Sequence, residues 1–268
     1  LNAFRVTNCD LWAGMAFYAV GPLATFLVAS QWGLAARLLG KSRGRSLLLF
    51  GTLWLAWIAS DVVSFLTEPP IFAYNAFAGF FSGAVYDDLI RIDSPLLFFR
   101  FGNLAQLALF FAVIGPLYLS HRGILDLARI RSLGPKRWAV IGLTTLLVGA
   151  MSGASGYLGY DVDRSTIEAQ LGGKISNERI VLYYDQATIK PADAALILED
   201  QTFRLYQLES EFGDRYPAQI RSYVYGSKQQ KRRLMGAERT SIAKPWLNEV
   251  HLHRMPYGAG VVHHEIAH

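Results

Sequence analysis

The chain has 268 residues, of which 52% are hydrophobic, and its mean hydropathy is +0.22. This composition is too apolar for a wholly soluble protein of that length, so part of the chain is expected to lie in a membrane. The formal net charge is +5, but many basic residues lie in the short connections between apolar runs, a pattern that favours membrane orientation over nucleic-acid binding.

The first half, residues 1–157, is expected to be an all-α transmembrane bundle. A helix that crosses the hydrocarbon core needs roughly 17–25 predominantly apolar residues. Four runs reach that length: 11–31, 47–66, 97–119 and 138–156. The single cysteine, Cys9, cannot form an internal disulfide and is expected to be structurally inert.

The charges between these runs predict how the bundle is oriented. Residues 37–45 and 120–137 are rich in Arg and Lys and are expected to be cytoplasmic, whereas 67–96 is acidic and is expected outside. With four spans, Leu1 and everything after about residue 157 also face outside. We therefore expect a multi-pass protein of the cell membrane, with its folded domain extracytoplasmic and an earlier crossing before Leu1.

Two features of the membrane half leave alternatives open. The stretch "IFAYNAFAGFFSGAVY" at 71–86 is short and interrupted by Gly and Asn, so it is interpreted as an interfacial or re-entrant segment and not as a fifth span. Asp61 and Arg100 lie at similar depth near the outer ends of the second and third spans. They either form an interhelical ion pair or extend separately to the outer interface.

The second half, residues 158–268, predicts an α+β domain, because none of its apolar runs approaches membrane length. A capping box, Ser165-x-x-Glu168, opens a short helix. The remaining elements alternate along the chain: a strand at 179–185, a helix from Pro191 to about Phe212, a strand at 219–225, a helix at 227–235, a strand at 249–253 and a last helix from near Gly258. This order predicts a mixed sheet backed by helices.

One helix of this domain carries a basic cluster. Its members are Lys228, Lys231, Arg232 and Arg233. We expect a solvated helix face, with contact to anionic lipid headgroups as the functional alternative. Nucleic acid is excluded as a partner because no aromatic residues are interleaved with the basic ones.

The strand "EVHLH" at 249–253 shows strict alternation of apolar and polar residues. Val250 and Leu252 point to one side of the strand, and His251 and His253 point to the other. We expect the two histidines to lie on an exposed face. A metal-ligand role is their alternative.

The last five residues, His264-Glu265-Ile266-Ala267-His268, form an HExxH pattern. Residues four apart on an α-helix lie nearly above one another, about 6 Å apart along the axis, so His264 and His268 can bind one metal ion. The pattern predicts Zn²⁺, with Glu265 flanking the same face and able to take a proton from a zinc-bound water. The reaction class is hydrolysis of a peptide or similar amide. His263 has no histidine four residues later, so it is expected to lie beside the metal ligands or at the surface and not to bind the metal.

A strand, a turn and an HExxH helix after a β-α-β-α-β region resemble the N-terminal half of a zincin metallopeptidase, most closely the gluzincin peptidases of the peptidase-MA-like type. The stretches "RIVLYYD", "IRSYVYGSKQQKRRLMGA" and "AKPWLNEVHLH" share this resemblance, which covers about residues 175–268. It implies that His264 and His268 are metal ligands and that Glu265 is the general base. It also implies that strand 249–253 is the edge beside which an extended peptide or protein substrate lies.

The sequence departs from the gluzincin pattern at the third protein ligand. Gluzincins supply this ligand, a Glu, from a helix downstream of HExxH. That ligand is expected beyond His268, so we expect a fragment that binds zinc weakly and hydrolyses poorly by itself. Two other zinc enzymes remain open, an intramembrane protease and a membrane zincin of the prenyl-protease type. A non-enzyme alternative is a catalytically inactive, membrane-tethered binding or scaffold module of zincin fold.

Overall fold

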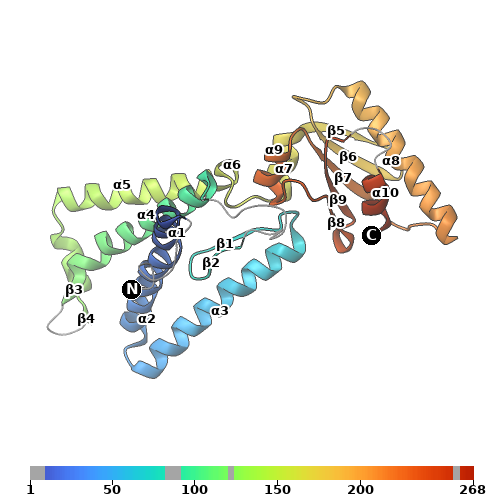
Figure 1. Ribbon diagram of the computed structural model, residues 1–268. Helices are drawn as coiled ribbons and strands as arrows, with labels where there is room; N and C mark the ends of the chain where they lie inside the picture. The colour runs from blue at the N-terminus through green and yellow to red at the C-terminus, as the bar shows by residue number, and fades with distance from the viewer. Residues whose placement is uncertain (1–9, 82–91, 120–123, 256–259) are drawn as a thin grey trace. The chain divides into compact units, whose positions relative to one another are not determined.

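The computed structural model describes residues 10–81, 92–119, 124–255 and 260–268 (Figure 1). These residues belong to two compact units. The first unit contains the chain up to Val63, Tyr74–Phe81 and the chain from 92 to Asp161. The second contains Ser64–Ala73 and Val162–His268, so it includes one stretch from the first half of the sequence.

Helices make up most of the first unit. A continuous helical stretch runs through α1 (Leu11–Tyr18), η2 (Ala19–Leu23) and α2 (Ala24–Gly40). The π-helical turn η2 contains Pro22, whose ring and missing N–H disturb the regular α-helical hydrogen bonds. The next two long helices are α3 (Arg43–Thr67) and α4 (Ser94–Leu117). Within the described residues, these three helical stretches are long and apolar enough to cross a membrane.

A helix that is long and apolar enough to cross a membrane is therefore confirmed for each of the first three runs. The fourth run, 138–156, is helical and lies in α5 (Pro135–Gly153) and α6 (Ser155–Leu158), but α5 is not among the three helices that are long and apolar enough. Between α4 and α5 lie the paired short strands β3 (Tyr118–Leu119) and β4 (Ile124–Leu125) and the 3₁₀ helix η3 (Leu127–Ser132).

The basic connection between α2 and α3 is tighter than the sequence suggests, because the two helices are separated only by Lys41 and Ser42. A Cβ atom on Gly40 would lie 2.6 Å from the backbone nitrogen of Ser46. The close approach of the two helices at this turn therefore requires glycine.

The stretch 71–86 contains no helix in its described part. Residues Ala73–Asn75 (β1) pair with Gly79–Phe81 (β2), and residues 82–86 lie outside the described residues. This hairpin supplies a polar partner to α3, because the side chain of Asn75 donates a hydrogen bond to the carboxylate of Asp61.

Arg100 of α4 bonds to neutral side chains. Its guanidinium donates to Asn103, 3.1 Å away on the same helix, and to Thr25 of α2 at 3.0 Å. Of the two alternatives left open by the sequence, the interhelical ion pair between Asp61 and Arg100 is therefore not formed. Arg100 is also buried, and an amide and a hydroxyl group of the first unit accept hydrogen bonds from its two terminal nitrogens, while its Nε has no partner among the described residues.

A five-stranded sheet forms the centre of the second unit, with strand order β5-β6-β7-β9-β8. The three central strands are parallel: β6 (Ile180–Asp185), β7 (Ile220–Tyr225) and β9 (Glu249–His253). Both edge strands are antiparallel to their neighbours: β5 (Gly172–Ser176) and β8 (Ile242–Lys244). The mixed sheet is confirmed. The expectation that 249–253 is the edge strand is wrong, because β8 pairs with its outer side.

Four helices of the second unit match the predicted ones: α7 (Arg164–Leu171), α8 (Pro191–Phe212), α9 (Lys228–Met235) and α10 (Gly260–Ala267). Pro191 occupies the first turn of α8 as expected. The predicted capping box of Ser165 and Glu168 is wrong, because α7 is capped by Asp163. The carboxylate of Asp163 accepts the N–H of Thr166 and caps the helix, and the hydroxyl of Ser165 donates to that same carboxylate.

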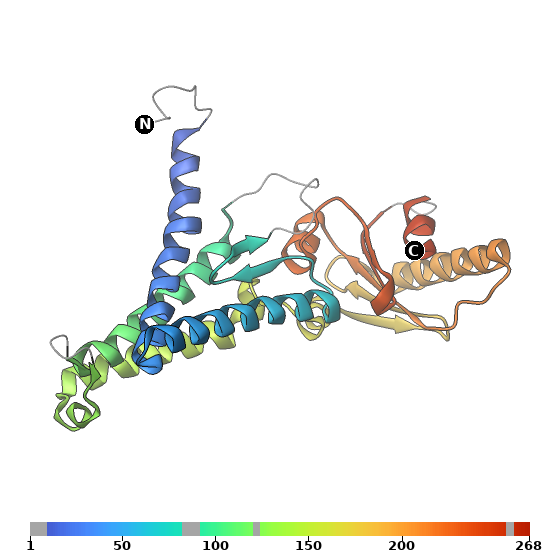
Figure 2. The same ribbon diagram turned by 90° about the horizontal axis from the view of Figure 1, so that it is seen from below.

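Both faces of the sheet are covered. On one side, which we call the α8 face, strand residues such as Leu182 and Leu252 pack with α8 and with Val262 of α10. On the other side, the α7 face, Tyr183 and Tyr223 belong to a core shared with α7, α9 and segment 64–73. Figures 1 and 2 both show α10 beside α8, on the side of the sheet away from α7 and α9.

Candidate functional site

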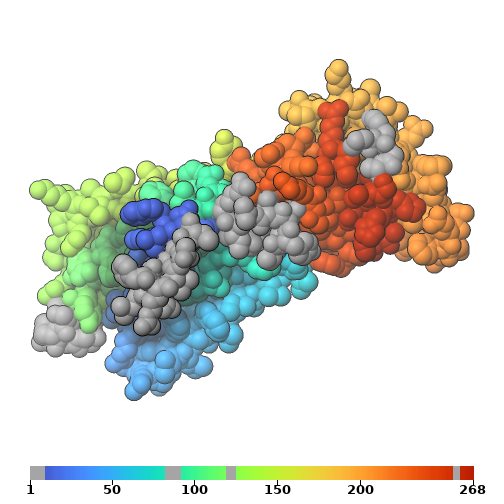
Figure 3. All heavy atoms as spheres, viewed as in Figure 1, coloured from blue at the N-terminus to red at the C-terminus, as the bar shows by residue number. Residues whose placement is uncertain are grey.

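Helix α10 places the HExxH residues at the surface of the second unit, where the C-terminal residues appear in red in Figure 3. It contacts α8, β8 and β9. Val262 is buried in the core of the α8 face, and Ile266, one turn later, packs against the same core. These two residues fix one side of the helix to the sheet, so His264 and His268 lie on its exposed side.

The two imidazole rings lie close together with their Nε2 atoms adjacent. Their Nε2 atoms are 3.2 Å apart, and the rings lie at 84° with centroids 4.7 Å apart. Two nitrogen ligands of one tetrahedral zinc ion, each bonded at about 2.0–2.1 Å, are separated by about 3.3 Å. The donor atoms of His264 and His268 thus have the type and the separation that a shared zinc ion requires.

Glu265 lies between the histidine side and the packed side of α10. It follows His264 by about 100° around the helix axis, and it is only 8% exposed while both histidines are exposed. A carboxylate in this position flanks the imidazole pair and is shielded from bulk water. This placement is compatible with a proton acceptor next to a metal-bound water.

The described part of the chain offers two candidate ligands at this site and not three. Across these residues, no group of three or more His, Cys, Asp or Glu side chains is placed to hold a metal ion. His263 does not join the pair. Its Nε2 atom lies 3.9 Å from a carboxylate oxygen of Glu211 on α8.

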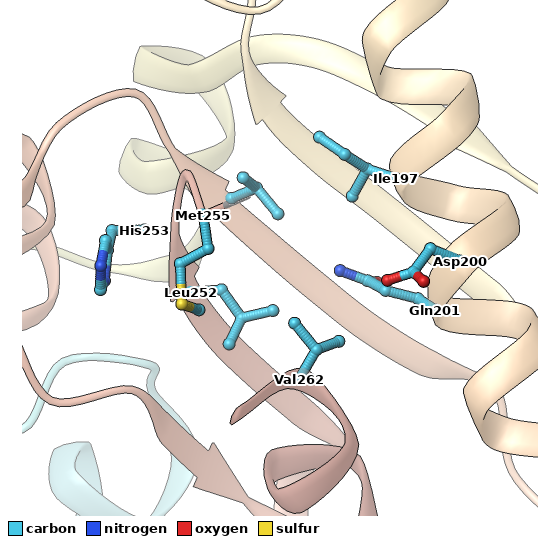
Figure 4. A pocket seen from close by; sticks show the side chains of 8 residues that line it. Ile197, Asp200, Gln201, Leu252, His253, Met255 and Val262 are labelled. Atoms are coloured by element: carbon cyan, nitrogen blue, oxygen red, sulfur yellow. The ribbon is translucent and has the colours of Figure 1, made fainter. Parts of the chain in front are cut away.

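A separate hollow lies on the packed side of α10 (Figure 4). It encloses about 360 Å³, counted with the solvent space at its mouth. The lining residues come from α8, β7, β9, the segment after β9 and α10: Ile197, Asp200, Gln201, Val224, Leu252, His253, Met255 and Val262. Since Val262 faces this hollow and the imidazoles of His264 and His268 do not line it, the hollow is distinct from the candidate metal site.

The histidines of β9 are not on an exposed face, and that prediction is wrong. His251 is fully buried and His253 is half-buried. The predicted alternation is correct, but the polar side of β9 is covered by the core of the α7 face. The ring of His251 stacks on Tyr223 at 4.7 Å, and its Nδ1 atom lies 3.1 Å from the hydroxyl of Tyr225.

Glu249 connects this histidine to a basic side chain. One of its carboxylate oxygens accepts a hydrogen bond from Arg164 at 2.8 Å, and the other lies 3.6 Å from His251 Nε2. Burial alone would raise the pKa of Glu249, but hydrogen bonds and the positive charge of Arg164 outweigh it, so the pKa lies below its usual value. Burial lowers the pKa of His251, which keeps its ring neutral.

The basic cluster of α9 is only partly a solvated face. Lys228 and Arg233 are exposed, as expected, but Lys231 is fully buried and donates to the backbone carbonyl of Thr240. The expectation is wrong for Lys231 because the chain after α9 folds back over this side of the helix. Its ammonium group fixes the loop that leads to β8.

The sequence interpretation missed a group of polar residues around residues 64–73. No role was assigned from the sequence to Lys244 and Trp246, in the stretch "AKPW", or to Arg164. In the structure, all three bond to backbone carbonyls of residues 65–70. One feature of the sequence could have indicated this contact. Lys244 and Trp246 flank a proline, and both are amphipathic side chains that can cover the end of another segment.

Comparison with known protein families, with curated proteins and with solved structures finds no match to this chain. The resemblance to zincins therefore rests on the residues and on the geometry of α10.

Proposed function

We propose that this chain is part of a membrane-anchored zinc metallopeptidase of the gluzincin type. The observation that supports it is the 3.2 Å separation of the Nε2 atoms of His264 and His268 on one turn of α10. A bound zinc ion would supply a Lewis acid that makes a water molecule acidic enough to be deprotonated near neutral pH. Glu265 would take that proton and later return it to the leaving amine.

A third ligand is needed for a catalytic zinc site with one open position. By the resemblance to gluzincins, we propose a Glu on a helix that follows His268 in the sequence. A peptide substrate can bind in extended form along β8, because β8 and not β9 is the outermost strand on the side of the sheet that α10 contacts. Adding a strand to a sheet edge satisfies the backbone hydrogen bonds of an extended peptide.

Zinc binding tests the site directly. We expect the chain to bind zinc, with the dissociation constant rising at least tenfold in His264→Ala and in His268→Ala, since each removes one ligand. His263→Ala is the matched control, because it removes a neighbouring imidazole outside the pair, and it should change the constant by less than twofold. Equal zinc affinity in wild type and His264→Ala would exclude the site.

Hydrolysis tests the role of Glu265. In a chain that extends past His268 and includes the proposed third ligand, Glu265→Gln should bind zinc like the wild type and lose about 10²- to 10⁴-fold in peptide hydrolysis, since it lacks the proton acceptor. Full activity in Glu265→Gln would remove it as the general base.

A catalytically inactive binding or scaffold module is the second candidate. The observation in its favour is that the described residues supply two metal ligands and not three. A chain extended past His268 that binds one zinc ion per molecule but hydrolyses no peptide, with or without Glu265, would support this second candidate.

We also propose four spans, with α5 as the fourth and the second unit extracytoplasmic. The alternation of basic and acidic connections supports this topology. In a Cys9→Ser background, Leu125→Cys should react with a membrane-impermeant maleimide only from the cytoplasmic side, and Arg215→Cys only from the outside. Reaction of both from one side would overturn the four-span topology and favour a site that faces the cytoplasm.

A further inference from the structure

The last turn of α3 ends inside the second unit and not in open solvent. A helix leaves its last four carbonyl groups without helical partners. In α3 and the residues that follow it, side chains from distant parts of the sequence fill this need. Lys244, Trp246 and Arg164 all donate to carbonyl oxygens between Phe65 and Pro70.

Lys244 makes the largest contribution. Its ammonium group donates to the carbonyls of Phe65 at 3.0 Å, Glu68 at 2.7 Å and Pro70 at 3.1 Å. An ammonium group has three N–H donors, so every donor of Lys244 is used. The side chain is only 1% exposed, and a positive charge at a helix C-terminus is favourable because the helix dipole is negative there.

Arg164 and Trp246 complete the same contact. The guanidinium of Arg164 donates to the carbonyl of Thr67 at 3.1 Å, and the indole N–H of Trp246 donates to the carbonyl of Leu66 at 2.9 Å. In return, the carboxylate of Glu68 accepts the backbone N–H of Arg164 at the first turn of α7, at 2.9 Å. The end of one helix and the start of another therefore cap each other.

These residues lie on elements that also touch the candidate zinc helix. Lys244 belongs to β8, the edge strand, and in the antiparallel register of the two strands it lies opposite Glu249 of β9. The carboxylate of Glu249 is held by Arg164, and α10 contacts both β8 and β9. A shift of residues 64–70 must either move β8 with it or leave the buried ammonium of Lys244 without acceptors, which is costly.

We propose that Lys244, Trp246 and Arg164 form a latch that binds residues 64–70 and thereby couples the end of the membrane helix α3 to the edge strand β8. The latch has two states. When it is closed, segment 64–73 covers part of the α7 face and β8 is fixed. When it opens, Lys244 turns to solvent, and β8 and the contact between β8 and α10 loosen together. The proposal does not depend on zinc binding or hydrolysis.

Hydrogen exchange of the full chain in detergent micelles tests the coupling. Lys244→Met keeps the length of the side chain and removes all three donors. We expect the exchange rates of the amides in peptides 64–73 and 242–253 to rise at least tenfold, while β6 peptide 180–185 changes less than twofold. Lys228→Met, at an exposed lysine of α9, is the control and should leave all three peptides unchanged. If peptide 64–73 exchanged at the same rate in Lys244→Met as in the wild type, the latch would be overturned.

A change on the other partner gives the reciprocal test. Pro70→Gly keeps the carbonyl that Lys244 binds but makes the released segment more flexible, which favours the open state about two- to fivefold. The latch predicts an increase of that size in the exchange of 242–253, although no residue there is altered. Unchanged exchange of 242–253 would show that the two segments are not coupled.

A milder variant keeps the test decisive if Lys244→Met unfolds the whole unit. Trp246→Phe retains the aromatic ring and removes only the N–H bonded to Leu66. It should raise the exchange of 64–73 and 242–253 together by a smaller factor than Lys244→Met. An increase confined to 242–253 would count against the latch.

Discussion

The two faces of the five-stranded sheet are both buried, yet they are built from different side chains. The α8 face is mainly apolar, with Ser222 as a buried polar residue, and α8 and α10 pack on it with Leu, Ile and Val. The α7 face also buries Glu249, His251 and Lys244, each of which contacts a polar group of another side chain or of the backbone. The comparison shows that a polar strand face can be an interior face when its charges meet partners there.

The functional elements are distributed differently over the two faces. The candidate zinc residues lie on the outer side of α10, and the buried side of this helix packs on the α8 face through Val262 and Ile266. The end of the long apolar helix α3 is held by hydrogen bonds on the α7 face. Hydrogen bonds to a helix end form only within a narrow range of distances and angles, so the α7 face is suited to transmit a displacement of that end.

Removing the charge at the centre of the α7 face should have the largest effect. Glu249 is 1% exposed and pairs with Arg164, so Glu249→Ala leaves a guanidinium without its buried partner. Breaking a fully buried pair costs about 3–5 kcal/mol, and because the Arg164 side chain is 27% exposed we expect a loss at the lower end, about 3 kcal/mol. The measurement is the free energy of unfolding of the second unit in urea. The hydrogen exchange of the amides in peptide 180–185 reports the unfolding. Glu178→Ala, at an exposed glutamate, is the control, and an equal loss in both would show that Glu249 has no special role.

The apolar face should respond to a cavity. Leu182 is fully buried on β6, and Leu182→Ala should lower the free energy of unfolding by about 3 kcal/mol through lost transfer energy and the space left behind. Leu196, on α8, is 51% exposed, so Leu196→Ala should cost less than about 0.5 kcal/mol. If both leucines proved equivalent, the α8 face would not be the core of this unit.

A contact between β5 and β6 tests how tightly the α8 face is packed. A Cβ atom on Gly173 would lie 2.6 Å from the ring of Tyr184, directly opposite on β6. Gly173→Ala should therefore force the ring aside and destabilise the unit by about 2 kcal/mol. Gly142→Ala is the control, since a Cβ there meets nothing within 4 Å. A neutral Gly173→Ala would mean that the ring moves freely.

Acid should affect the α7 face first. Burial lowers the pKa of His251 from its usual 6.5. Below pH 6.5 the unfolded chain takes up a proton that the folded chain resists, so the stability present above that pH is lost as the pH falls, by at most about 1.4 kcal/mol per pH unit. Unfolding at pH 7.5 and pH 5.5 measures this loss. His251→Phe should flatten the dependence, and an unchanged slope in that variant would assign it to another group.

Much of the second unit follows from local patterns. The strands β6, β7 and β9 and the helices α8 and α10 were predicted from alternation, helical periodicity and Pro191. The strands β5 and β8 were missed, because β5 contains two glycines and β8 has only three residues in a stretch rich in turn residues. Neither has an intrinsic preference for a strand, and both become strands only because a neighbouring strand offers hydrogen bonds.

The candidate site divides in the same way. The spacing of His264 and His268 on one helical turn follows from the period of the α-helix, so the sequence determined that their Nε2 atoms could meet. The environment of His251 and Lys231 could not be predicted, since the local pattern shows which side chains share a face and not what covers that face.

The sequence by itself determined the three long apolar helices, the alternation of strands and helices, and the pairing of two imidazoles on α10. Only the tertiary structure decided that the polar face of β9 is buried, that β8 is the edge strand, and that residues 64–70 are bound by Lys244, Trp246 and Arg164. The physical reason is distance along the chain. Periodicity acts over a few residues, whereas Lys244 meets its carbonyl partners across more than 170 positions.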